Sequence, residues 1–113
     1  MIDGWITQLR KGVLEFCVLT VLSRGESYGY EIVQALKQMD ELAVSESTIY
    51  PILARLRDEK FLKVRDVPSD AGPPRRYFAL TALGKVRLAE MNTYWSLLGQ
   101  ALAQLQSSPR KDA

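Results

Sequence analysis

Residues 43–57 carry side chains suited to a polar, anionic partner. Ser45 stands where a helix N-cap is expected, and Glu46 suits the positive end of the helix dipole. Four apolar residues then follow the i, i+3, i+4, i+7 spacing of an amphipathic helix: Ile49, Ile52, Leu53 and Leu56. The opposite face carries small or hydrogen-bonding side chains: Ser47, Thr48, Tyr50, Ala54 and Arg55. Such groups bond phosphates and base edges, so this face predicts contact with nucleic acid; the alternative is an ordinary solvated helix.

Basic residues continue beyond this helix on a predicted β-hairpin. Side chains alternate in polarity over residues 61–67, which is the period of a strand. Residues 68–74 are dense in turn formers, and residues 75–80 form a second strand. The cations that we expect to contact the DNA backbone or the minor groove are Lys63, Arg65, Arg75 and Arg76. Each cation alone is better explained as a solvated surface charge, so the cluster carries the prediction.

The composition excludes most enzyme chemistry. The 113 residues contain no histidine, which removes imidazole acid–base catalysis, Ser-His and Cys-His nucleophile pairs and His-containing zinc sites. Asp58 and Glu59 are adjacent and diverge on a helix, so they do not form a catalytic pair. We therefore expect no catalytic residues, no metal and no cofactor. The single cysteine, Cys17, is expected to be a buried thiol in a reducing compartment.

The sequence also predicts a cytoplasmic protein. The longest apolar run, over residues 13–22, is too short to cross a bilayer. The first residues lack a basic segment followed by an apolar core, so no signal peptide and no membrane partner are expected. The net charge of +2 is only weakly basic, which means that the distribution of charge is more informative than its sum.

The remaining elements complete a winged helix-turn-helix. A first helix is expected from about residues 7–11 to Ser23 and a second over residues 28–39, capped by Ser27. Two helices joined by a short turn and followed by a hairpin form this fold. The predicted class is mainly α with a small β-hairpin: a DNA-binding domain over residues 1–80, a long C-terminal dimerisation helix over residues 81–106 and a flexible tail over residues 107–113.

The last helix, capped by Thr81, carries a coiled-coil pattern. From residue 88 its apolar side chains are spaced 3, 4, 3, 4, 3, which is a heptad seam. A small domain offers no further layer to cover such a seam, so a second copy of the chain is the expected partner. The residues predicted to form this homodimer are Leu88, Met91, Leu98, Leu102 and Leu105, with Leu9, Val13 and Phe16 from the first helix.

Four segments together resemble the PadR family of bacterial transcriptional regulators: residues 9–14, 28–32, 47–56 and 73–84. Tyr-Gly-Tyr-Glu at residues 28–31 and Thr-Ile-Tyr-Pro at residues 48–51 are the most specific pieces. The resemblance is to the short subgroup with one C-terminal helix. It implies a homodimeric repressor that binds a near-palindromic DNA operator. The sequence departs from the family pattern at Lys60, where a glycine usually ends the third helix, so a different cap is expected there.

The resemblance also implies a small aromatic effector. Some relatives are released from DNA by a phenolic acid or a flat drug-like molecule, and Trp95 resembles a tryptophan that stacks on such ligands. The candidate effector residues are Trp95, Phe16, Met91 and Tyr94. The alternative for Trp95 is a packed hydrophobic anchor. The alternative for the whole chain is a winged-helix module that binds proteins without reading DNA, and the hydroxyl face and basic hairpin favour DNA over it.

Overall fold

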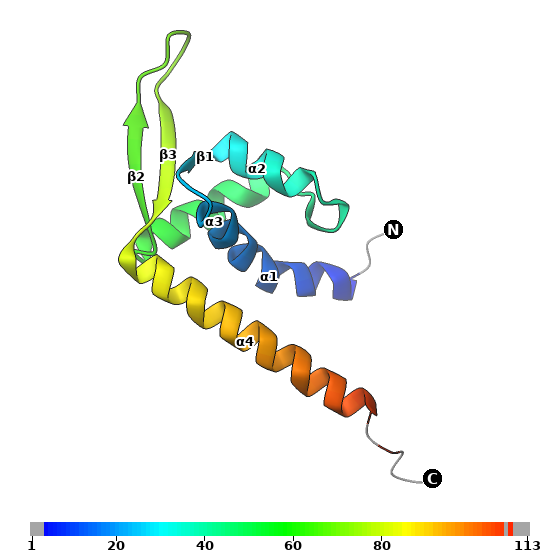
Figure 1. Ribbon diagram of the computed structural model, residues 1–113. Coiled ribbons are helices and arrows are strands. Elements are labelled where there is room, and N and C mark those ends of the chain that lie inside the picture. The colour runs from blue at the N-terminus through cyan, green and yellow to red at the C-terminus, as the bar shows by residue number, and fades with distance from the viewer. Residues whose placement is uncertain (1–3, 108, 110–113) are drawn as a thin grey trace.

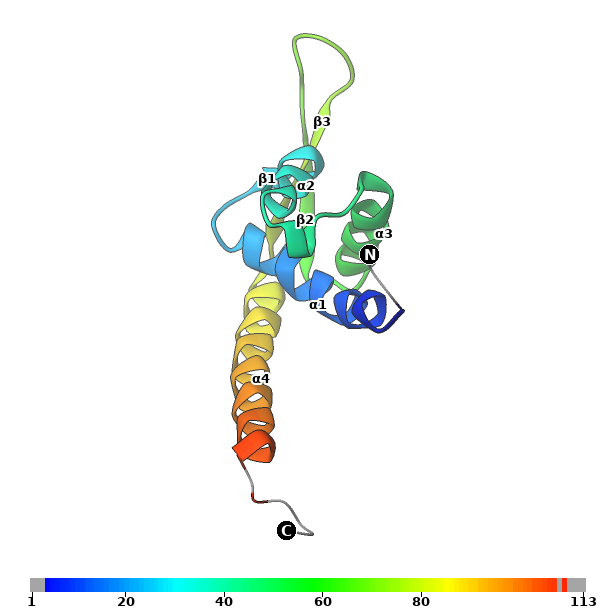
Figure 2. The same cartoon turned by 90° about the vertical axis from the view of Figure 1, so that its right-hand side faces the viewer.

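The computed structural model describes residues 4–107 and 109. Its elements, in chain order, are α1 (Gly4–Leu22), β1 (Ser27–Tyr28), α2 (Gly29–Lys37), a 3-10 turn η1 (Asp40–Leu42), α3 (Glu46–Asp58), β2 (Leu62–Val67), β3 (Arg75–Leu80) and α4 (Ala82–Ser107). The first three helices pack together, the β2–β3 hairpin projects from them, and α4 runs away from this body (Figures 1 and 2). The predicted winged helix-turn-helix with a long C-terminal helix is confirmed. The expected flexible tail lies almost entirely outside the described residues.

The wing is a three-stranded antiparallel sheet rather than the predicted hairpin alone. Its order is β1-β3-β2, and Ser27 and Tyr28 pair with Phe78 and Tyr77. The prediction that Ser27 caps α2 is wrong, because pairing with β3 keeps this residue extended. Tyr28 is the N-cap instead, and its backbone N–H donates to the carboxylate of Glu31 at 3.0 Å. A two-residue strand is too short to be recognised from periodicity.

The core lies between the three packed helices and the inner face of the sheet. The predicted stripe on α3 is confirmed: Ile49, Leu53 and Leu56 are buried, and Ile52 is half-buried. On the sheet, Phe78 is buried as predicted.

Three helix boundaries differ from the sequence-based expectation. The first helix begins at Gly4 and ends at Leu22, and α2 ends two residues before Met39. Cys17 is half-buried, and this burial raises the pKa of its thiol.

A Schellman motif ends α3 without a glycine. Lys60 takes the left-handed conformation, with φ of 71°. Its N–H donates to the carbonyl of Arg57, and the N–H of Phe61 donates to the carbonyl of Leu56, both at 2.9 Å. Phe61 and Leu56 are both buried, which is the apolar contact that accompanies this motif. The expectation of a different cap at Lys60 is therefore wrong: Lys60 adopts the left-handed conformation that glycine usually supplies in this motif.

The end of α3 is bonded directly to the start of α4. The carbonyl of Phe61 accepts the N–H of Thr81 at 3.1 Å, and the hydroxyl of Thr81 donates to the carbonyl of Lys60 at 2.7 Å. The same hydroxyl accepts the N–H of Gly84 at 2.9 Å, which confirms Thr81 as the helix cap. A Cβ on Gly84 would collide with the carbonyl oxygen of Phe61, so only glycine fits this joint.

Most of α4 is uncovered in one subunit. Only Gly84 and Leu88 are buried along its 26 residues, whereas Leu98, Leu102 and Leu105 are 46%, 54% and 74% exposed. Leu88 belongs to the core of its own subunit. Within the described residues, no helix is long and apolar enough to cross a membrane.

We predict that Lys60→Gly stabilises the protein. Glycine adopts a positive φ without the steric cost of a Cβ, and the relief outweighs the extra entropy of the unfolded chain by about 0.5 to 1 kcal/mol. Denaturant unfolding at one fixed protein concentration measures the gain. Lys60→Ala is the matched control, because it removes the charge and keeps the strain. A Lys60→Gly protein no more stable than Lys60→Ala would contradict the assignment of strain to Lys60.

Candidate nucleic-acid interface

The polar face of α3 is exposed as a unit. Ser47, Thr48 and Tyr50 all lie at the surface, at the N-terminal half of the helix. The hydroxyl of Ser45 is within 2.7 Å of the hydroxyl of Ser47 and 3.4 Å of that of Thr48. Ser45 is the N-cap residue as predicted, yet its side chain makes no capping bond to the backbone. Three exposed hydroxyls therefore gather at the N-terminal end of α3, the positive end of the helix dipole, which favours an anionic partner.

A cleft separates this helix from the wing. It has a volume of about 440 Å³ and is lined by Tyr28, Gly29, Tyr50, Ala54, Arg57, Pro74, Arg75, Arg76 and Phe78. Four elements contribute to it: β1, the start of α2, the exposed face of α3, and β3 with the residue that precedes it. Three arginines and two tyrosines thus line one hollow. Charged and neutral donors of this kind bind the phosphate oxygens of a nucleic acid backbone.

The ring of Tyr50 packs against Gly29, where there is no side chain to obstruct it. A Cβ added to Gly29 would lie 2.5 Å from Cε1 of Tyr50 and 2.8 Å from its hydroxyl oxygen, so the ring rests directly on the start of α2. Burial, with a smaller effect from Glu46, raises the pKa of Tyr50. The phenol therefore remains protonated at neutral pH and can donate a hydrogen bond.

The predicted basic residues fall into three groups: two arginines that line the cleft, one exposed lysine outside it, and two arginines paired with carboxylates. Arg75 and Arg76 line the cleft, and the guanidinium of Arg75 lies 4.8 Å from the ring centroid of Tyr28. Arg76 also lies 3.4 Å from the carboxylate of Asp66. Lys63 is exposed on β2. The remaining two arginines are held elsewhere in the subunit.

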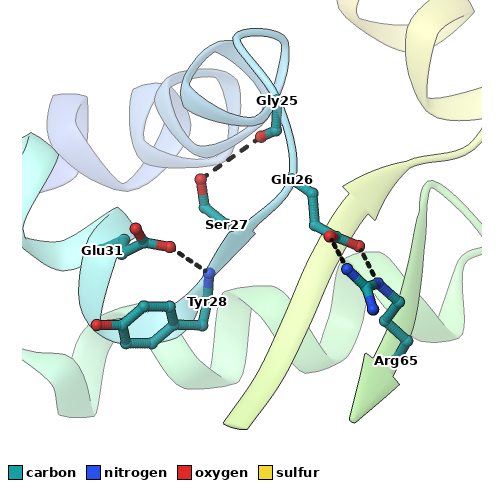
Figure 3. Close-up of polar contacts among 6 residues, drawn as sticks. All are labelled: Gly25, Glu26, Ser27, Tyr28, Glu31 and Arg65. Carbon is teal, nitrogen blue, oxygen red and sulfur yellow. Dashed lines mark hydrogen bonds and ion pairs between the residues drawn. The ribbon is translucent and has the colours of Figure 1, made fainter. Parts of the chain in front are cut away.

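Arg55 and Arg65 are engaged by carboxylates of distant segments. Arg55 pairs with Glu15 of α1 at 3.3 Å and with Glu59 at 3.6 Å. Arg65 makes two short bonds, of 2.7 and 2.6 Å, to the two carboxylate oxygens of Glu26 (Figure 3). Neither residue lines the cleft. The sequence placed both on polar faces and could not show their partners.

The cleft also contains members that sequence reasoning missed. Tyr28 was assigned to a helix start, and Gly29 and Pro74 were given no role at the site. The signal that could have found Tyr28 is its place in the Tyr-Gly-Tyr-Glu piece that carried the family resemblance. Its contact with Arg75 joins segments 47 residues apart in the chain, and no local pattern reports such a contact.

A second, apolar cavity lies between α1 and α4. Its volume is about 500 Å³, and it includes all four candidate effector residues together with Leu9, Val13 and Leu98. Trp95 meets Phe16 edge to face, with ring centroids 6.1 Å apart, and stays 52% exposed. Leu102 and Leu105 lie further along α4, outside this cavity. Among the described residues, no group of three or more His, Cys, Asp or Glu could hold a metal ion.

Comparison with known proteins relates this chain to regulators of transcription. Residues 18–90 match the transcriptional regulator PadR-like family. The chain is 34% identical over 80 residues to the negative transcriptional regulator PadR of Bacillus subtilis. The matched region covers 67% of this chain and 43% of that protein. The chain is also 31% identical over 81 residues to the transcriptional regulator YqjI of Escherichia coli, covering 70% and 37%. The chain therefore spans less than half the length of these two relatives.

Solved structures share the fold. A PadR-like transcriptional regulator from Bacillus cereus superposes with a TM-score of 0.78 at 35% identity, covering 90% of this chain and 99% of that chain. The structure of Bacillus subtilis PadR in complex with operator DNA has a TM-score of 0.66 at 31% identity, covering 70% and 46%. With residues 18–90 matched and the winged helix superposed over nearly its whole length, the chain belongs to the PadR-like family of transcriptional regulators.

Proposed function

We propose that this protein is a homodimeric repressor that binds a near-palindromic operator. Two copies of α3 enter successive major grooves, about one helical turn or roughly 34 Å apart. The wing follows the DNA backbone beside each groove. One relative supports this function: Bacillus subtilis PadR is named as a negative regulator and has been crystallised with operator DNA. Its site of action is the cytoplasm.

The observation that carries the proposal is the cleft between α3 and the wing. Arg57, Arg75 and Arg76 line it together with Tyr50. A duplex that inserts its major groove on the exposed face of α3 brings a phosphate backbone over this hollow. Ser47 and Thr48, at the start of the helix, then face base edges. A protein-binding module has no need of three arginines lining one cleft, so the cleft favours DNA over that alternative.

A symmetric dimer explains the uncovered face of α4. An apolar stripe along a helix that projects from the body is larger than soluble monomers usually expose. Packing α4 against α1 and α4 of a second copy covers the residues beyond Leu88. The two-fold axis then presents both α3 helices to the same side of the DNA.

The cavity between α1 and α4 supports a flat aromatic effector. Trp95 and Phe16 form its aromatic wall, and Met91 and Tyr94 lie beside them. A ligand stacked on Trp95 at the dimer centre releases DNA by favouring one spacing of the α3 helices over another. A differential affinity of about 1.4 kcal/mol changes DNA binding tenfold, and useful induction needs about twice that.

The first prediction of this function concerns the cleft arginines. Arg75→Ala/Arg76→Ala is expected to weaken binding to every duplex and to lower the salt dependence, by about 0.9 in the log–log slope for each lost phosphate contact. Fluorescence anisotropy with a duplex from the region upstream of this gene, over a series of salt concentrations, measures both. Lys11→Ala/Lys37→Ala removes two charges away from the cleft and should change little. Equal effects of the two double variants would contradict a role for the cleft.

The second prediction concerns the dimer. Leu98→Lys or Leu102→Lys places a charge in the proposed seam and should yield monomers or aggregates, because subunit folding and association are coupled. Gln100→Lys, on the opposite side of α4, should leave the dimer intact. Sedimentation velocity at micromolar concentration distinguishes these states. A wild-type protein that sediments as a stable monomer would refute the dimer.

The third prediction concerns Trp95. Titration with planar phenols and dyes should quench its emission and weaken DNA binding in parallel. Trp5→Phe removes the other tryptophan of the chain, so that the signal reports Trp95 alone. If no compound in the panel alters emission or DNA affinity, Trp95 is packing at the dimer interface.

A further inference from the structure

The base of the wing is tied to the helical body by one ion pair that spans the sheet. Arg65 extends from β2 across β3 to Glu26, which lies in the turn between α1 and β1 (Figure 3). Both carboxylate oxygens are engaged, at 2.6 and 2.7 Å. A bidentate pair of this geometry is the kind of surface ion pair that does stabilise a structure.

The ion pair acts where backbone pairing is weakest. The sheet holds β1 by only two residue pairs, Ser27 with Phe78 and Tyr28 with Tyr77. In contrast, β2 and β3 are paired over six residues. The attachment of the β2–β3 hairpin to the helices through β1 therefore depends on interactions between side chains.

The ion pair also orders one row of side chains across the sheet. Arg65, Tyr77 and Tyr28 occupy paired positions on β2, β3 and β1. The guanidinium of Arg65 lies 5.7 Å from the ring centroid of Tyr77, and the rings of Tyr77 and Tyr28 are 5.3 Å apart. Arg75 closes this series over Tyr28, at the edge of the cleft. The position of a cleft arginine is thus linked to the ion pair through two contacting rings.

We propose that Glu26 and Arg65 are positioning residues for DNA binding, which hold the wing so that Arg75 lies at the cleft. This inference rests on the function proposed above. It changes the predicted role of Arg65 from a phosphate ligand to a structural partner of Glu26. It also gives a role to an acidic residue in a surface that binds an anion.

The charge of Glu26 distinguishes a positioning role from a purely electrostatic one. Hydrogen bonds from Arg65 lower the pKa of Glu26, so the carboxylate is charged at neutral pH. If Glu26 were only a charge near DNA, its removal would reduce repulsion and tighten binding. If it positions the wing, its removal weakens binding although the protein becomes more positive. The two accounts differ in the sign of the effect.

The experiment compares Glu26→Gln with Asp70→Asn on the duplex used above. Asp70 is an exposed carboxylate in the wing loop, so both variants lose one negative charge near the wing. Glu26→Gln should weaken binding by about three- to tenfold, a typical coupling for residues in contact, with the salt slope unchanged. Asp70→Asn should leave affinity equal or slightly higher. Unchanged or tighter binding by Glu26→Gln overturns the proposal.

A double-mutant cycle tests the pairing itself. Arg65→Gln should weaken binding, and adding Glu26→Gln to it should cause no further loss, because the two changes remove one shared interaction. Additive losses, or a salt slope lowered by about 0.9 per subunit in Arg65→Gln alone, would make Arg65 a phosphate ligand and overturn the proposal. The charge-swapped protein, Glu26→Arg/Arg65→Glu, should regain part of the lost affinity.

A measurement without DNA separates this inference from the proposed function. Hydrogen exchange at the backbone N–H groups of β1 should be faster in Glu26→Gln than in Asp70→Asn, with the thermal unfolding of both proteins cooperative. Equal exchange in the two variants overturns the positioning role. If the wild-type protein binds no duplex while Glu26→Gln still exchanges faster than Asp70→Asn, the proposed function is refuted and the ion pair remains as the wing attachment.

Discussion

The contacts of the Phe61 carbonyl group set how α3 and α4 are arranged relative to each other. This carbonyl group lies just beyond the last turn of α3, accepts the N–H of Thr81 and leaves room only for glycine at residue 84. The end of α3 and the start of α4 are therefore one rigid joint, reinforced by the hydroxyl of Thr81. Since α4 is the proposed dimer helix, the direction in which each α3 faces DNA is set at this joint.

A second attachment, at the base of the wing, completes the frame of the cleft. The joint fixes α3 relative to α4, and the Glu26–Arg65 pair ties the β2–β3 hairpin to the turn that precedes α2. The cleft is lined by residues of β1, α2, α3 and β3. One of its arginines, Arg75, lies over the ring of Tyr28. A small change at either attachment would move the arginines proposed to bind phosphate relative to α3.

Local patterns in the sequence predicted the elements well, and contacts between distant residues escaped them. The stripe of α3, strand β3 at residues 75–80 and the cap at Thr81 follow from spacing and residue type, and all three are confirmed. Membership in a family of transcription factors confirms the prediction that the chain is not an enzyme. Strand β1 was missed because two residues carry no period. The partners of Arg55 and Arg65 were missed because Glu15 and Glu26 lie about 40 residues earlier in the chain. The cleft itself exists only once α2, α3 and β3 are packed.

In the proposed dimer, the α4 helices hold two clefts at a fixed separation, and both clefts bind the same side of one duplex. Binding to operators with altered spacing between half-sites tests this arrangement most directly. With half-sites one helical turn apart, about 10 base pairs, affinity should be highest. Insertion of about five base pairs rotates one half-site to the opposite side of the duplex, and affinity should fall to that of a single half-site. Equal affinity at all spacings would contradict a rigid dimer of winged helices.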